Sequence, residues 1–188
     1  MNGFYSPEEL KEFGFKHVGE NVLISKKASL YDTAQMSFGH DIRIDDFCIL
    51  VGKITMGNYI HIAPFAGLHG SGGGEVVLED FCSVASQSSI YSGSDDFSGN
   101  AMVNPMVPEK FRNTITSKIV LGKYSVVGLN CVLLPGAFLA EGSSLGAMSL
   151  LTKATDPWGV HVGIPAKRIK DRSQKIIALE KDFLAEIE

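Results

Sequence analysis

An apolar side chain recurs every six residues along most of this chain, and this period constrains the fold more than any other feature of the sequence. Five groups of three positions follow it, namely Phe38, Ile44, Leu50, Met56, Ile62, Leu68, Leu78, Val84, Ile90, Leu121, Val127, Leu133, Leu139, Leu145 and Leu151. All fifteen are apolar, whereas a chain that is 45% hydrophobic would supply about half of them by chance. The period therefore predicts many short, regularly spaced strands.

A second column of small or apolar residues lies two positions before the first. Its members are Met36, Ile42, Cys48, Ile54, Ile60, Ala66, Val76, Cys82, Ser88, Ile119, Ser125, Cys131, Ala137, Ser143 and Ser149. Side chains two apart on a strand share a face, so both columns point inward. The three cysteines all fall in this column, and none belongs to a CxxC pair. We expect buried free thiols rather than disulfides or a zinc site.

The six-residue period also sets the shape of each turn of the chain. Three hexads make eighteen residues, which separate Phe38 from Met56 and Leu121 from Leu139. Eighteen residues suit one triangular coil of three short strands, and stacked coils pair strands about 4.7–4.9 Å apart. Glycine often follows the apolar position, at residues 39, 57, 122, 128 and 146, and we expect it to supply the unusual φ/ψ of the corners. The predicted fold class is all-β, a parallel β-helix.

Short helices are expected at the two ends. Ser6, Pro7 and Glu9 form a capping box with proline at the first helical position, so a helix is predicted over roughly residues 7–13. From Ser173 onward, apolar residues return at helical spacing. This second helix is expected to cap the solenoid or to pack on a neighbouring subunit.

We treat residues 1–188 as a single domain with three parts. These are an N-terminal helix with an irregular first coil over 1–35, the β-helix over 36–155, and a tail with the C-terminal helix over 156–188. A loop at 92–117 interrupts the β-helix. Loops of this length in compact domains are usually functional or disordered, and its apolar content favours packing on something.

The six-residue period breaks twice, after Leu68 and after Ile90. Both insertions follow the third strand of their coil, so they are expected to leave the same corner of the triangle on adjacent coils. His69 and Tyr91 each come one residue after the inward column there. We therefore expect their side chains to stack about one strand spacing apart.

Charge and hydropathy limit the possible partners. The net charge of -4 does not suit a general nucleic-acid binder, which usually carries a basic face. The N-terminus lacks the basic start and apolar run of a signal peptide, and no stretch of 18 apolar residues appears. A soluble cytoplasmic protein without nucleic-acid binding or membrane insertion is predicted.

The repeat, the long loop and the tail GVHVGIPAKRIK at 159–170 resemble the galactoside O-acetyltransferase-like branch of hexapeptide-repeat acyltransferases. Within that branch, NVLISKKAS, RIDDFCIL, DDFSGNA and GAMS resemble bacterial nucleotide-sugar N-acyltransferases. The resemblance covers about residues 20–170. It implies a left-handed β-helix, a homotrimer with active sites between subunits, and an acyl group delivered by acyl-CoA, most often acetyl-CoA, without a metal.

The resemblance also implies where coenzyme A binds. Its pantetheine arm would contact Gly128, Ala147 and Thr152, largely through backbone groups. Its phosphates would meet a cationic set, because phosphate favours charge-assisted donors. That set consists of Lys153, Lys167, Arg168 and Lys170.

The family's catalytic histidine has no match in this chain, because its place is taken by Asp95. A carboxylate with a pKa of about 3.9 is a weak base for a sugar hydroxyl. An amine already has a nucleophilic lone pair and needs mainly orientation, so N-acylation of a nucleotide-linked amino sugar for surface polysaccharide synthesis is favoured, with backbone N–H groups stabilising the oxyanion. Asp95 would hold the amino group. The alternative is that Asp95 and Asp96 only form an Asx-type turn.

His69 is the rival base, and its ordinary pKa of about 6.5 suits that task. If His69 is the base, O-acetylation of a galactoside-type or polysaccharide hydroxyl becomes the alternative function. Asp96, Ser86 and Tyr91 are the expected substrate contacts, with Ser86 facing outward on the strand that leads to the loop.

Two other classes stay open from the sequence. A trimeric zinc hydratase of the γ-carbonic anhydrase type needs three converging histidines, and the nearest pair here, His61 and His69, is eight residues apart and on different corners. A structural β-helix without catalysis is the third possibility. The long loop and the cationic tail argue against it.

Overall fold

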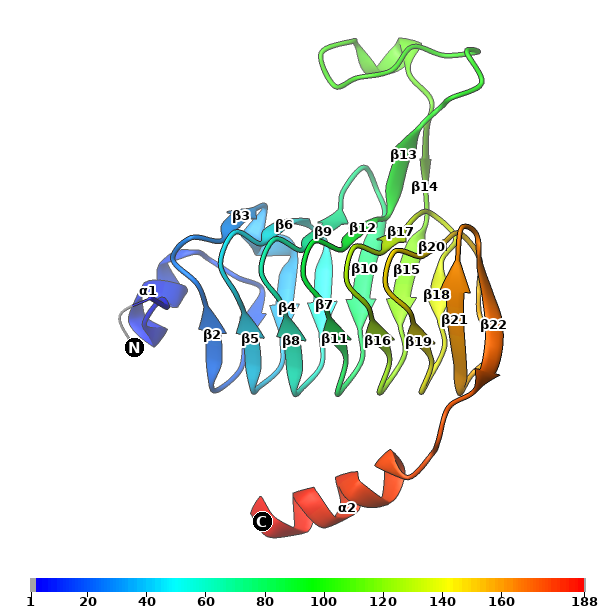
Figure 1. Ribbon diagram of the computed structural model, residues 1–188. Helices are drawn as coiled ribbons and strands as arrows, with labels where there is room; N and C mark the ends of the chain where they lie inside the picture. Colours follow the sequence, from blue (N-terminus) through cyan, green and yellow to red (C-terminus); the bar gives the residue numbers. More distant parts are fainter. Residues whose placement is uncertain (1–2, 188) are drawn as a thin grey trace.

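The computed structural model describes residues 3–187, which form a triangular solenoid of stacked parallel coils with a helix at each end (Figure 1). Consecutive strands of one coil belong to three different sheets, and each strand pairs in parallel with the equivalent strand of the next coil. The predicted fold class, a parallel β-helix with short N- and C-terminal helices, is confirmed.

Three sheets form the sides of the prism. The first contains β1 (His17–Val18), β4 (Met36–Phe38), β7 (Ile54–Met56), β10 (Glu75–Leu78), β15 (Lys118–Leu121) and β18 (Phe138–Leu139). The second contains β2 (Val22–Ile24), β5 (Ile42–Ile44), β8 (Ile60–Ile62), β11 (Ser83–Val84), β16 (Val126–Val127), β19 (Ser144–Leu145), β21 (Gly159–Gly163) and β22 (Ala166–Asp171). The third contains β3 (Ser29–Tyr31), β6 (Ile49–Gly52), β9 (Gly67–Gly70), β12 (Ser89–Tyr91), β17 (Val132–Leu133) and β20 (Leu150–Leu151). We name the edges after the sheets that they join, in chain order: first–second, second–third and third–first.

The core is the interior of the prism, and both predicted columns fill it. Every one of their thirty side chains is at most 4% exposed, including the three cysteines, which are free. Burying one such aliphatic side chain contributes about 1.5–3 kcal/mol, so the core is the main source of stability. The parallel ladder between coils satisfies the backbone groups of the strands.

The corner glycines are required for a different reason from the one expected. Gly39, Gly57, Gly122, Gly128 and Gly146 do not have positive φ. At Gly122, for example, an added Cβ would lie 2.7 Å from the backbone nitrogen of Glu141 in the next coil. Close approach between coils, rather than dihedral freedom, therefore excludes larger side chains.

The left-handed corner positions are occupied mostly by larger residues. On the first–second edge, Tyr59, Phe81, Tyr124 and Trp158 have φ between 54° and 61°. Such a conformation costs roughly 1–2 kcal/mol for a residue with a Cβ. Their rings form a ladder, with centroids 4.8 Å apart between Tyr59 and Phe81, and this packing offsets the cost.

At the N-terminal end the predicted helix is present, but the first coil is more regular than predicted. Helix α1 (Pro7–Glu12) begins with a complete capping box between Ser6 and Glu9. The expected irregular first coil is wrong for most of its length, because β1, β2 and β3 pair in register with β4, β5 and β6. Only the turn η1 (Thr33–Gln35) departs from the hexads, because it adds two residues before β4.

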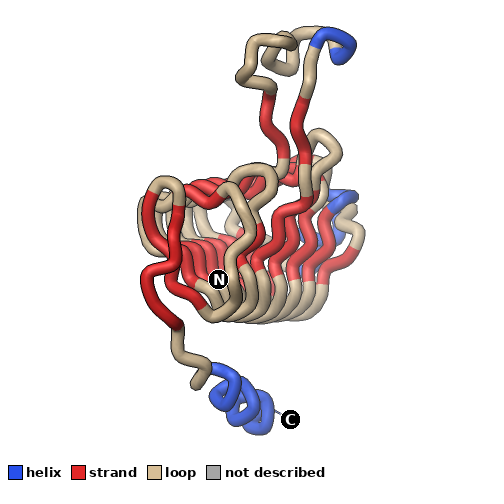
Figure 2. The backbone as a smooth tube through the Cα atoms, turned by 90° about the vertical axis from the view of Figure 1, so that its right-hand side faces the viewer, coloured by secondary structure: helices blue, strands red, loops and turns tan. Residues whose placement is uncertain are grey.

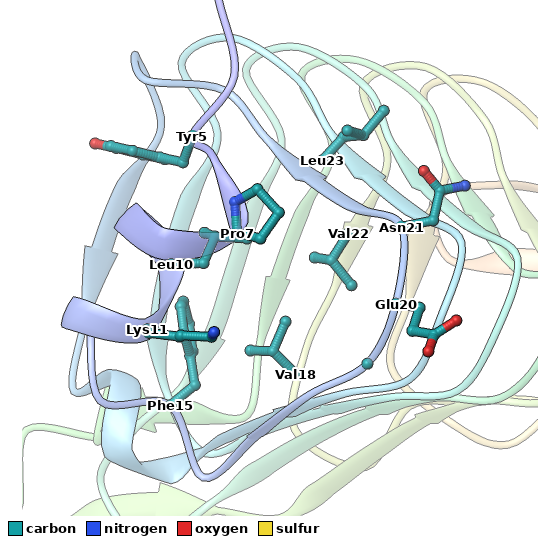
Figure 3. Close-up of a pocket in the computed structure, with 11 residues that line it drawn as sticks. Tyr5, Pro7, Leu10, Lys11, Phe15, Val18, Glu20, Asn21, Val22 and Leu23 are labelled. Carbon is teal, nitrogen blue, oxygen red and sulfur yellow. The ribbon is translucent and has the colours of Figure 1, made fainter.

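A cavity of about 600 Å³ lies between α1 and this first coil (Figure 3). Its apolar lining includes Leu10, Phe15, Val18 and Val22. The cavity lies at the N-terminal end of the prism, which α1 covers. It is far along the solenoid from the predicted coenzyme A residues.

The C-terminal end extends the solenoid beyond residue 155. Strand β21 pairs in parallel with β19, and β22 pairs antiparallel with β21, so much of the predicted tail belongs to the second sheet. Helix α2 (Ile176–Ile187) then lies along the first–second edge (Figure 1). Its Phe183 meets the ring of Tyr59 with centroids 5.2 Å apart, and Glu180 pairs with Lys123 at 2.7 Å. The helix therefore packs along the side of its own solenoid.

Candidate functional site

Both insertions leave the solenoid at the third–first edge, as predicted. The longer one is a hairpin of β13 (Gly93–Asp95) and β14 (Thr114–Thr116), which carries the turn η2 (Glu109–Phe111) at its far end. Figure 2, seen nearly along the solenoid axis, shows the hairpin projecting away from the prism. At its base, the Ser117 N–H donates to the Ser92 carbonyl at 2.9 Å, and the Ser92 N–H donates to the His69 carbonyl at 3.0 Å. These bonds tie both insertions to one place.

His69 and Tyr91 stack at this base, as predicted from their register. Their ring centroids lie 4.1 Å apart and their planes are nearly parallel. Burial lowers the pKa of His69 below its ordinary value, so its imidazole is neutral near pH 7. A neutral imidazole can accept a proton, so His69 is in the protonation state that a base requires, while burial weakens its basicity.

The two aspartates at the end of β13 differ in the hydrogen bonds that their carboxylates accept. Asp96 accepts hydrogen bonds from the Ser98 N–H at 2.8 Å and from the Asn113 side chain at 3.2 Å. These bonds, that of Ser98 above all, lower the pKa of its carboxyl. Asp95 has one long contact, 3.4 Å from the Asn104 N–H. The expected Asx turn is thus formed by Asp96, whereas the carboxylate of Asp95 stays largely available.

Ser86 lies in the turn between β11 and β12, on the second–third edge, and not on the strand leading to the hairpin as predicted. The register explains this difference, because the strand positions before the hairpin are Ser89–Tyr91. The Asn130 N–H donates to the Ser86 carbonyl at 3.1 Å, which places Ser86 one coil from the corner that begins at Gly128. The corner with Ala147 follows in the next coil.

The remaining predicted coenzyme A residues gather at the C-terminal end. A cavity of about 310 Å³ is lined there by Thr152, Lys153, Lys167 and Arg168 but not by Lys170. The guanidinium of Arg168 donates to the carbonyls of Pro157 and Trp158 and to Asp171. It is therefore held by the protein, whereas the three lysines form no ion pair within residues 3–187.

One chain does not bring the predicted residues together. Ser86, Gly128 and Ala147 lie on the second–third edge, whereas His69, Tyr91 and Asp95 belong to the third–first edge. The five residues from Ser86 to Tyr91 cross the third sheet, a span of about 16 Å at 3.3 Å per residue. On one chain the two edges are therefore separated by the width of the third sheet.

The outer surface of the third sheet and its corner with the second sheet is unusually apolar. Its exposed side chains are Tyr31, Phe47, Ile49, Phe65, Tyr91, Leu129, Val132 and Met148. Phe47 and Phe65 stack with centroids 4.9 Å apart, while Phe65 and Met148 are 57% and 69% exposed. We call this surface the apolar face. A group of exposed apolar side chains of this kind is typical of a protein–protein contact.

Sequence reasoning missed a polar cluster on the second–third edge. Asp45 is bonded there by Arg43 and His61, each at 2.7 Å. The register of the hexads pairs Arg43 with His61, a signal that the sequence carried.

Within residues 3–187, no group of three or more His, Cys, Asp or Glu side chains is placed to hold a metal ion. No helix in the same range is long and apolar enough to cross a membrane.

A parallel solenoid of six-residue repeats, with a long hairpin inserted at one edge, defines the class of hexapeptide-repeat acyltransferases. No protein-family model matches the chain. The chain is 42% identical, over 178 residues, to the dTDP-4-amino-4,6-dideoxy-D-glucose acyltransferase of Escherichia coli, and the match covers 93% of this chain and 92% of that one. The chain therefore belongs to the CoA-dependent nucleotide-amino-sugar acyltransferases of this class.

Solved structures of AntD, an N-acyltransferase from Bacillus cereus, are similar throughout. The complex of AntD with dTDP and 3-hydroxybutyryl-CoA has a TM-score of 0.96 at 44% identity, covering 100% of this chain and 99% of that chain. A serine-to-alanine variant with dTDP-4-amino-4,6-dideoxyglucose and coenzyme A has a TM-score of 0.96 at 45% identity, covering 99% and 100%. An aspartate-to-alanine variant was also solved, and in AntD that aspartate follows the serine by ten positions. The resemblance stated from the sequence is confirmed.

Proposed function

We propose that the protein transfers an acyl group from acyl-CoA to the amino group of a dTDP-linked 4-amino-4,6-dideoxy sugar. The observation that carries this proposal is the match, over nearly the whole chain, to an N-acyltransferase solved with such a sugar nucleotide and coenzyme A. The absence of a histidine where the family's hydroxyl-acylating members carry one favours an amine acceptor. The three buried free thiols are consistent with a reducing, cytoplasmic compartment.

We infer a homotrimer because the predicted site residues of one chain lie on two different edges of the prism. If three copies turn their apolar faces toward a common axis, the third–first edge of one copy lies beside the second–third edge of the next. The hairpin of the first copy, with Asp95 and Asp96, then reaches Ser86 of its neighbour. The exposed Phe97 and Met106 of the hairpin, each at least 90% exposed, support contact with another chain.

The acyl-CoA would lie along the second–third edge. Gly128 and Ala147 meet the pantetheine arm in successive coils, with the thioester near Ser86. The phosphates of the acyl-CoA would reach the C-terminal cavity, where Lys167 and Lys153, the latter on the third–first edge, would serve them, with Lys170 nearby. Arg168 acts differently from the expectation, because its bonds to carbonyls and to Asp171 make it a brace for this end rather than a free phosphate ligand.

The reaction requires little from acid–base residues. The amine nitrogen attacks the thioester carbon, the C–N bond forms, and the carbonyl oxygen becomes an oxyanion held by backbone N–H groups. The C–S bond then breaks, and the proton of the new ammonium group passes to the departing thiolate. Asp95 would orient the amine by accepting a hydrogen bond, and His69 would remain the alternative proton acceptor.

The varied residues of AntD support a further assignment. Ser86 and Asp96 of this chain are also ten positions apart, whereas Ser86 and Asp95 are nine apart. This spacing supports Ser86 and Asp96 as substrate contacts beside Asp95. Tyr91, stacked on His69, would form part of the wall next to the sugar.

The experiment that tests the function measures thiol release from several acyl-CoAs with a dTDP-linked 4-amino sugar and with its 4-hydroxyl analogue. We expect rapid turnover with the amine and slow turnover with the alcohol. Acetyl-CoA is the default donor, and 3-hydroxybutyryl-CoA belongs in the same panel. Equal or faster reaction of the hydroxyl analogue would favour O-acetylation and His69.

Replacing the aspartates separately tests their roles. We expect Asp95→Ala to lower kcat/KM for the amino sugar by about 10–100-fold, the usual effect of losing a hydrogen bond to a charged group. Asp95→Asn, which keeps an acceptor oxygen, serves as its matched control and should lose less. Near-wild-type turnover of Asp95→Ala would mean that its role is structural, and the same measurement on Asp96→Ala would show whether Asp96 carries the contact.

A further inference from the structure

The cluster of Asp45, Arg43 and His61 has no part in the function proposed above. Arg43 lies in the middle of β5 and His61 in the middle of β8, and they are paired across adjacent coils. The Arg43 Nε–H donates to one oxygen of Asp45 at 2.7 Å, and Nε2 of His61 lies 2.7 Å from the other. Both oxygens of one carboxylate thus hold two nitrogen-bearing side chains in place.

The two nitrogen-bearing side chains of the cluster are exposed, whereas its carboxylate is nearly buried. The side chain of Asp45 is only 11% exposed, while those of Arg43 and His61 are 56% and 46% exposed. Burial disfavours ionisation of Asp45, but the bonds from His61 and Arg43 outweigh it and lower the pKa of the carboxyl. A nearly buried, ionised carboxylate beneath two exposed side chains fixes the direction in which both of them project.

The guanidinium of Arg43 is held in a fixed plane. Its Nε is used by Asp45, and its central carbon lies 5.4 Å from the ring centroid of Phe4. Its two Nη groups have no protein partner within residues 3–187. A preorganised guanidinium fork matches the oxygens of a phosphate group and loses little side-chain entropy when it binds them.

The position of the cluster along the edge indicates which phosphate group of the substrates Arg43 would meet. The Phe65 N–H donates to the Asp46 carbonyl, and the Gln87 N–H donates to the Pro64 carbonyl, so the corner of Asp45 lies two coils before that of Ser86. Two strand spacings are about 9.5 Å. With acyl-CoA on the C-terminal side of Ser86, the acceptor must occupy the N-terminal side. Its sugar ring separates the reacting amine from the diphosphate, which then falls near the cluster.

We propose that Arg43, oriented by Asp45 beside His61, binds the diphosphate of the acceptor and makes the enzyme select nucleotide-linked over free amino sugars. This inference rests on the proposed function, because it uses the direction in which the two substrates lie along the edge. The contact serves binding and not the chemical step.

The test compares wild type, Arg43→Ala and Arg43→Lys, with Lys181→Ala as a control that removes one cation from an exposed position of α2. Calorimetric titration with dTDP alone should show a Kd raised about 10–100-fold in Arg43→Ala. The KM for the nucleotide sugar should rise similarly, with kcat and the KM for acyl-CoA within about threefold of wild type. Arg43→Lys should fall between, because lysine keeps the charge but not the fork.

The outcomes separate this inference from the function on which it rests. If wild type acylates the nucleotide sugar but Arg43→Ala binds dTDP as wild type does, the diphosphate contact is wrong and the function stands. If wild type acylates no nucleotide sugar, the proposed function fails, and the dTDP titration still reports on the contact by itself. A change in assembly mass of Arg43→Ala with unchanged dTDP affinity would make the cluster a subunit contact and would overturn the inference.

Discussion

At the scale of single residues, the distance between coils decides which side chains are allowed. Gly122 faces the backbone of residues 140–141, and a Cβ there would lie 2.7 Å from a backbone nitrogen that cannot turn aside. The same crowding recurs at the other corner glycines, whereas the left-handed positions accept Tyr59 and Phe81 because their rings stack. The hexad therefore combines a steric requirement at one position with a packing gain two residues later.

We expect Gly122→Ala to lower the free energy of unfolding by about 1–3 kcal/mol, because the coils must separate to admit the methyl group. Denaturant unfolding followed by circular dichroism measures this change. Gly3→Ala is the matched control, since nothing lies within 4 Å of an added Cβ there. Equal stability of the two variants would show that the coils can relax without cost.

At the scale of elements, the hairpin is separable from the solenoid. Its strands pair only with each other, and the bond between Ser92 and Ser117 closes its base. The core columns continue beneath it without interruption, since β12 pairs with both β9 and β17. The strand pairing of the solenoid therefore does not involve the hairpin.

Replacing residues 93–116 with two glycines should leave the thermal midpoint close to that of wild type, because no core side chain is removed. We expect kcat/KM for the amino sugar to fall by about 100-fold or more, since the groups that position the acceptor are lost. Coenzyme A should still bind in a titration. Loss of the folded solenoid would contradict the separation of scaffold and hairpin.

At the scale of the whole molecule, the apolar face gathers eight exposed apolar side chains on one side of the solenoid. Phe65 lies at its corner with the second sheet, stacked on Phe47 and 57% exposed. A charge introduced there would have to be desolvated on assembly. In the proposed homotrimer the two halves of the active site come from different copies, so activity should be lost when the assembly is lost.

We therefore expect Phe65→Glu to have the mass of one chain instead of three in light scattering, and to lose activity. Phe138→Glu, which places the same change on the first sheet at a residue that is 40% exposed, should keep both mass and activity. A trimeric Phe65→Glu protein would show that another surface forms the interface.

The sequence determined the solenoid because its signal is local and repeated. A period of six, held by Phe38, Ile44, Leu50 and their successors, fixes which side chains point inward, and it placed both insertions on one edge and His69 beside Tyr91. The same local signal failed where packing between coils takes over. The corner glycines proved to be sites of contact, and the expected irregular first coil proved to be in register with the second.

Only the tertiary structure decided how the candidate site is divided. Ser86 lies at a corner, and the guanidinium of Arg168 donates to the carbonyls of Pro157 and Trp158. Asp45 is bonded by Arg43 and His61, which lie on different strands. These relations depend on side chains that meet across coils or edges, and no spacing along the chain encodes the direction in which an exposed side chain turns. The order of residues determines a repeated burial pattern. Contacts between polar side chains of different coils form only when the coils stack.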